Sequence, residues 1–238
     1  MKHFFLFISI WLFLGMAANV NGQTTIIIPD SLGDPGGTGG VEFTPELKAQ
    51  YESLQELVLT SKSMNTPLPY KVDNSEKKYF RSIFLQKDGS CTQAAGIGYV
   101  FTYMVNRARD FAADVDANLY PTHYTYNYHN FGISTGGSEI TGWQIISNSG
   151  CPSVETYGGM FLYPEDQTKR LRVWMSGYDK YRDALSNRLI TDINCIRVQN
   201  PDNLIKLKHW FHNHAEGDTV KGGGLVTFST IVREAIVD

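Results

Sequence analysis

The sequence predicts an α+β protein in which helices dominate the first part of the chain and strands begin late. Apolar residues recur at helical spacing over residues 97–111 and 138–148. Strand patterns appear only at residues 193–198 and 225–232, the second of them after a Gly-Gly-Gly turn. The composition, 42% hydrophobic and 19% charged, is that of a globular protein with its own core.

The N-terminus has the pattern of a secretory signal peptide over residues 1–22. A basic start precedes an apolar run at residues 4–14, and small or polar residues continue to Gly22. We expect cleavage after Gly22 and a secreted, periplasmic or cell-surface protein. The apolar run is too short for a comfortable membrane span and no second candidate follows, so we predict no membrane span.

Residues 23–43 are expected to form a flexible Gly-rich linker. The stretch at residues 31–40 could be mistaken for a phosphate loop, but it lacks the following Lys-Ser/Thr and a preceding strand. A flexible segment is the better interpretation of so many glycines.

A helix is expected to begin at Thr44-Pro45, with Thr as the N-cap and Pro at the first helical position, and to fade near Lys62. We therefore separate a helical segment, residues 44–66, from a single domain over residues 67–238. Further helices are expected within that domain at residues 138–148, 178–189 and 204–212, whereas residues 120–133 have no clear period.

Cys91 lies where a loop gives way to a helix pattern. Ser90 and Gln93 have the spacing of a capping box, which would fix the helix start at Ser90. Unpaired backbone N–H groups in the first helical turn stabilise a thiolate over a thiol, so Cys91 is a candidate nucleophile. A buried structural cysteine, or half of a disulfide, fits the spacing equally well.

The three cysteines are an odd number for an oxidising compartment, where a leftover thiol suggests a task of its own. Cys151 and Cys195 could form a disulfide and leave Cys91 free. The net charge of −3 and the absence of a basic stripe argue against nucleic acid as a partner.

Histidines offer weaker candidates for a site. The His-x-x-His-x-His motif could bind a metal with Glu216 or Asp218, but a solvated helix end is the better interpretation, and we predict no cofactor. Either of two histidines in the tyrosine-rich stretch could neighbour Cys91. The motif comprises His209, His212 and His214, and the other two are His123 and His129.

Three blocks follow one another along the domain. They are Leu-Pro-x-x-Val-Asp at residues 68–73, Gln86 ahead of Gly-Ser-Cys at residues 89–91, and Gly136-Gly137 ahead of a helix and Ser-Gly-Cys-Pro-Ser-Val-Glu-Thr-Tyr at residues 149–157. In this order and at these intervals they resemble the papain-like cysteine peptidases. The resemblance covers roughly residues 68–232.

The resemblance implies a papain-like fold, with a helical left domain built around the Cys91 helix and the beginning of a β-rich right domain. It implies that Cys91 is the nucleophile, that Gln86 and the Cys91 backbone N–H stabilise the oxyanion, and that Gly136 and Gly137 bind an extended peptide or protein substrate. Residues 44–66 would stand in the place of the pro-region.

The chain also departs from the family pattern. Thr92 replaces the Trp after the nucleophile, Asp88 replaces a Cys, Ser134 replaces another, and Gln86 lies five rather than six residues before Cys91. The family's catalytic His and Asn lie beyond the strand resembling residues 225–228. We therefore expect an N-terminal fragment of a longer peptidase. The alternative is an inactive secreted homologue that serves as a surface or carbohydrate- or protein-binding module. The oligomeric state stays open.

Overall fold

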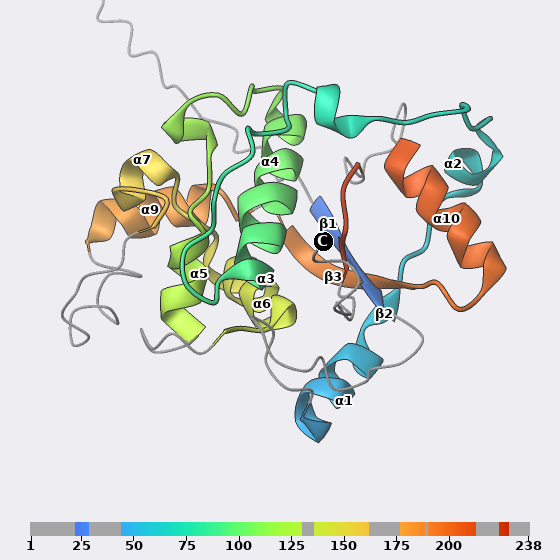
Figure 1. Cartoon of the computed structure of the whole chain (residues 1–238), viewed down its shortest axis with the longest axis horizontal. Coiled ribbons are helices and arrows are strands. Elements are labelled where there is room, and N and C mark those ends of the chain that lie inside the picture. Colours follow the sequence, from blue (N-terminus) through green and yellow to red (C-terminus); the bar gives the residue numbers. More distant parts are fainter. Residues whose placement is uncertain are drawn as a thin grey trace, which may run out of the picture.

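The computed structural model describes residues 22–28, 44–129, 136–161, 177–188, 190–212 and 224–228. It is a mixed, mostly helical protein with one small sheet, compatible with the predicted α+β class. In Figure 1 most of the helices lie to the left of the strands, while α2 and α10 lie to the right. No helix in the described ranges combines the length and the hydropathy that crossing a bilayer requires.

The sheet contains four parallel strands in the order β2-β3-β1-β4. The long strand β3 pairs with β1 along the whole of β1 and with β2 on its other side. β4, the last strand in the described residues, pairs with β1 through two residues. The strands are β1 (Gly22–Ile28), β2 (Gln55–Glu56), β3 (Ile190–Arg197) and β4 (Thr227–Phe228).

Two of these strands correct the predictions for the N-terminal part of the chain. The linker prediction for residues 23–43 is wrong at residues 23–28, which form β1 in the interior of the sheet. The rest of that linker and the signal-peptide prediction for residues 1–21 lie outside the described residues. The sequence signal was present in Thr-Thr-Ile-Ile-Ile, a β-branched run typical of a strand.

The single helix expected over residues 44–66 is divided into α1 (Pro45–Ser53) and α2 (Ser61–Asn65), with β2 between them. Its start is confirmed, because Leu47 N donates to Thr44 Oγ1 at 3.2 Å and Pro45 is the first helical residue. Burial of Tyr51 and Leu57 ties this region to the main protein.

Strand β3 separates two apolar clusters because alternate residues of a strand point to opposite faces. Cys195 belongs to the larger cluster, and its neighbour Ile196 packs with Leu57 and Trp210 in the smaller one. Trp210 lies in α10 (Pro201–His212), which confirms the helix expected at residues 204–212. Covering on both faces is the usual condition of a parallel sheet.

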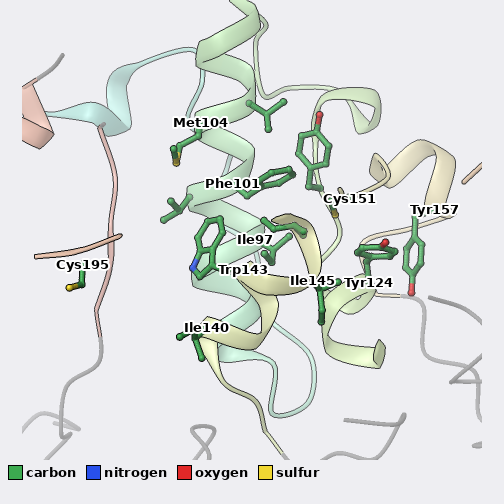
Figure 2. Packing of buried hydrophobic residues seen from close by; sticks show 14 of the residues in the cluster. Ile97, Phe101, Met104, Tyr124, Ile140, Trp143, Ile145, Cys151, Tyr157 and Cys195 are labelled. Carbon is green, nitrogen blue, oxygen red and sulfur yellow. The ribbon is translucent and has the colours of Figure 1, made fainter. Parts of the chain in front are cut away.

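The larger cluster surrounds one continuous helical rod. The rod begins as α3 (Cys91–Gln93), widens into a π-helical stretch (Ala94–Phe101), and continues as α4 (Thr102–Arg109). Trp143 of α6 (Glu139–Ser149) is fully buried against it and meets Phe101 edge-on, with ring centroids 6.5 Å apart (Figure 2). The helices expected at residues 97–111 and 138–148 are thus confirmed.

Cys151 and Cys195 do not form the disulfide that the sequence left open, because both are free cysteines. Figure 2 shows them on opposite sides of the apolar cluster. Each sulfur is buried in its own part of the core, so both serve as small apolar side chains.

The described residues also form the helices α5 (Thr122–His129), α7 (Val154–Tyr157) and α9 (Tyr178–Ser186). Helix α9 confirms the expectation for residues 178–189. Helix α5 lies within residues 120–133, where the sequence shows no clear period. Six consecutive residues of α5 are buried, so no polar face marks it in the sequence.

A salt-bridge cluster joins β2, β3 and α10. Glu56 accepts hydrogen bonds from the Arg197 backbone N at 3.3 Å, the Arg197 guanidinium at 2.9 Å and Lys206 Nζ at 3.4 Å.

Because the charges of Glu56 and Arg197 are about one-third exposed, we expect Glu56→Ala to lower the free energy of unfolding by only about 1 kcal/mol. Urea titration would measure it. Glu52→Ala, at the exposed pair with Lys48, is the control and should cost less than about 0.5 kcal/mol.

Candidate functional site

Cys91 is the first residue of its helix, as expected. The rod begins there because Ala94 N donates to the Ser90 carbonyl at 2.8 Å. The predicted capping box, however, is wrong. The Ser90 hydroxyl donates backward to the Lys87 carbonyl at 2.6 Å, which closes the turn before the helix, and Gln93 is bonded elsewhere.

Cys91 is the one cysteine of the three that is not buried, and its thiol is free. Contrary to expectation, the pKa of this thiol is raised. Burial raises it, the backbone N–H groups of Thr92 and Cys91 lower it, and the negative charge of Glu139 raises it again. The half-exposed helix start thus provides the expected N–H groups, but desolvation of the thiolate raises the pKa by more than these groups lower it. At neutral pH the sulfur carries its proton.

The Gly136–Ser138 backbone is held directly against the Cys91 turn. Thr92 Oγ1 donates to the Gly137 carbonyl at 3.2 Å, and Gln93 Nε2 donates to the Ser138 carbonyl at 2.9 Å. A Cβ on Gly89 would lie 3.0 Å from Gly136 N, so the two glycine segments touch through their backbones. The structure therefore brings together Cys91 and the two glycines predicted to bind substrate.

Gln86 lies in the exposed stretch that leads into the Cys91 turn. Asp88, which stands where the family has a Cys, adopts a left-handed backbone conformation with φ 56°. The predicted role of Gln86 at an oxyanion is an expectation of the resemblance and stays a prediction.

Glu139 is a charged neighbour of Cys91 that the sequence did not reveal. It is buried at the first position of α6, and its charge affects the pKa of both Cys91 and Tyr51. Tyr51, from α1, lies close enough to Glu139 that, after burial, the Glu139 charge is the next cause that raises its pKa. Helix α1 thus meets α6 beside the candidate site.

Two histidines lie around this segment. His129, at the end of α5, packs so closely on Gly137 that a Cβ there would overlap its Nε2, and burial lowers its pKa. His123 is buried, stacks on Tyr126 at 5.2 Å between centroids, and places Nε2 4.0 Å from Asp88 Oδ2. Imidazoles therefore flank the site from α5, as the sequence allowed.

A cavity of about 540 Å³ lies elsewhere, between residues 68–75, α10 and residues 224–225, and Cys91 does not line it. Lys208 is the one cation among the described residues that line it, and Asp73 is already bonded to Ser75. In the described ranges no three His, Cys, Asp or Glu side chains are grouped to hold a metal, and His214 of the His-x-x-His-x-His motif lies outside them.

The Glu139 charge predicts a measurable effect on thiol reactivity. Because that charge raises the pKa of Cys91, Glu139→Gln should lower this pKa and enlarge the thiolate fraction at pH 7. We expect the rate of Cys91 alkylation by iodoacetamide to increase roughly threefold, as for a shift of about half a pKa unit. Mass spectrometry over a pH series would measure it. Glu155→Gln, an exposed acid in α7, should leave the rate unchanged.

Comparisons with protein-family models, with curated proteins and with solved structures found no match. They therefore assign the chain to no family, and its relation to the papain-like peptidases stays a proposal.

Proposed function

We propose that the protein is a cysteine-type peptidase that hydrolyses peptide bonds with Cys91 as the nucleophile. The observation that carries the proposal is the placing of this thiol. It is the one cysteine of the three that is not buried, it opens a helix, and the Gly136–Ser138 backbone is bonded to the residues that follow it.

In the proposed reaction the Cys91 thiol first loses its proton to a base, which its raised pKa makes necessary. The resemblance assigns that role to a histidine of the strand-rich part of the fold. The thiolate attacks the peptide carbonyl, and the Cys91 backbone N–H and the Gln86 side chain stabilise the oxyanion. The amine leaves with the proton, and water then hydrolyses the acyl-enzyme.

Gly136 and Gly137 would position the substrate by backbone hydrogen bonds to an extended peptide. Glycines suit this role because no side chain keeps another backbone away. The Gly137 carbonyl already accepts from Thr92, which leaves it one lone pair.

Labelling with a peptidyl epoxide, a neutral electrophile attached to an extended peptide, tests the proposal. Cys91 should be modified at least about a hundredfold faster than it is by an epoxide without the peptide, because substrate contacts raise local concentration. Peptide mapping should find no label on the buried Cys151 and Cys195, and Cys91→Ala should abolish labelling. Equal rates with and without the peptide would contradict a substrate site.

The raised pKa favours one second candidate, an inactive homologue that acts as a surface or carbohydrate- or protein-binding module. A protonated thiol without a base is a poor nucleophile. In that case Cys91 would react with both epoxides at the same slow rate.

A further inference from the structure

Gln93 is the most constrained polar side chain near Cys91. It lies two residues after the nucleophile candidate and is 1% exposed. Its Nε2 donates to the Ser138 carbonyl at 2.9 Å and to Thr92 Oγ1 at 3.4 Å, while its Oε1 accepts from Thr125 Oγ1 at 2.6 Å. One carboxamide thus connects α3, α5 and the residue that precedes α6.

The surroundings of Gln93 are shaped to admit this amide. A Cβ on Gly142, in the first turns of α6, would overlap Gln93 Oε1, so the glycine leaves the space that the side chain occupies. An apolar residue of similar length would fill the same volume. It would remove the bonds to the Ser138 carbonyl and the Thr125 hydroxyl that a donor and an acceptor on one side chain supply together. Those two groups would keep only their longer bonds, from Gly142 N at 3.3 Å and to the Thr122 carbonyl at 3.4 Å.

We propose that Gln93 is a positioning residue that fixes the Cys91 turn against the Gly136–Ser138 backbone. The inference rests on the proposed function, in which the thiol and the substrate-binding glycines must lie at a fixed distance from each other. Gln93 itself touches neither the sulfur nor the substrate. It connects the Ser138 carbonyl with the start of the helix. The hydrogen bond from Thr92 Oγ1 to the Gly137 carbonyl is a second connection between the same two segments.

The first test uses the pH dependence of Cys91 alkylation by iodoacetamide, which needs no substrate site. In Gln93→Met the turn should separate from residues 136–139, so that water reaches the sulfur and Glu139 lies farther away. Both changes lower the pKa of Cys91, because burial and the Glu139 charge raise it in the parent protein. The midpoint of the pH profile should fall, and the rate at pH 7 should rise roughly threefold or more.

The matched control is Asn106→Leu. Asn106 is also a buried amide, 1% exposed, at the other end of the same rod, and its Nδ2 donates to the Asn118 carbonyl at 2.8 Å. It should lower the unfolding midpoint as Gln93→Met does without moving the pH profile. If Gln93→Met lowers only the unfolding midpoint and leaves the profile unchanged, Gln93 is merely structural and the inference is overturned.

A second pair of variants keeps the test decisive if Gln93→Met does not fold. Thr125→Val removes the hydroxyl that bonds to Gln93 Oε1, whereas Thr125→Ser retains it. Thr125→Val should shift the pH profile in the same direction as Gln93→Met, and Thr125→Ser should preserve the parent profile. Equal profiles for the two variants contradict the inference.

The peptidyl epoxide separates this inference from the proposed function. In the parent protein, Cys91 should prefer that probe over the epoxide without the peptide, and the preference should fall roughly tenfold in Gln93→Met while Asn106→Leu retains it. A parent protein without the preference rejects the peptidase. The iodoacetamide profiles then still decide whether Gln93 positions the turn.

Discussion

Gly150→Ala should lower the free energy of unfolding by about 4 kcal/mol or more. We expect this to be the largest loss from adding one methyl group to the described part of the helical region. Gly150 ends α6 with φ 71° and ψ −168°, a conformation that is essentially restricted to glycine. A Cβ there would also overlap the carbonyl oxygen of Ala184, which is backbone and cannot rotate away. Urea denaturation followed by circular dichroism would measure the loss.

Relaxation cannot relieve this overlap cheaply, because the joint between α6 and α9 is fixed by several hydrogen bonds. Asn187 Nδ2 donates to the Cys151 carbonyl at 3.0 Å, and Arg188 Nε donates to the Ser147 carbonyl at 2.7 Å. Arg109, the last residue of α4, donates from Nη1 to Asn187 Oδ1 at 2.6 Å and so connects the helical rod to the same joint. Moving Ala184 therefore disturbs three helices at once.

Gly177→Ala is the matched control. Gly177 also has a positive φ, 104°, but nothing lies within 4 Å of a Cβ built there. It should lose only the conformational part, about 1–2 kcal/mol. Equal losses at the two glycines would show that the contact with Ala184 contributes nothing, which contradicts the argument.

The helices could be predicted where an apolar stripe coincides with a terminal signal. Thr44-Pro45 begins α1 and Cys91 opens the rod, both as expected. Helix α5 was missed because burial on all sides removes the polar face on which periodicity depends. Strand β1 was missed although its β-branched run is a local strand signal, because its partner β3 begins more than 160 residues later and nothing nearby in the sequence indicated that pairing.

The candidate site could be predicted only in part, for a related reason. The residue types and their order along the chain suggested that Cys91 and the two glycines belong together, and the structure does place them together. The raised pKa of Cys91 could not be predicted, since it depends on burial and on Glu139, which a different helix supplies. The Ser90–Gln93 spacing was also misleading. Ser90 bonds instead to the carbonyl of Lys87, three residues earlier, and Gln93 bonds to the tertiary partners Ser138 and Thr125.

Gly137→Ala should disturb the candidate site through one identified contact. Gly137 has no positive φ, so alanine suits its backbone, but the new Cβ would overlap Nε2 of His129. We expect a loss of about 2–3 kcal/mol in unfolding free energy, because the imidazole or the Gly136–Ser138 backbone must shift. The peptidyl epoxide should label Cys91 roughly tenfold more slowly, since displaced backbone no longer aligns the probe.

A double-mutant cycle with His129→Ala identifies the cause. Removing the imidazole opens the space for the new methyl group, so Gly137→Ala should cost less than about 1 kcal/mol in the His129→Ala protein and the labelling rate should recover. Burial lowers the pKa of His129, so its ring is neutral at pH 7.5 and the cycle there reports packing rather than charge. If the two losses simply add, the His129 ring is not what excludes a side chain at Gly137, and its packing does not define this edge of the site.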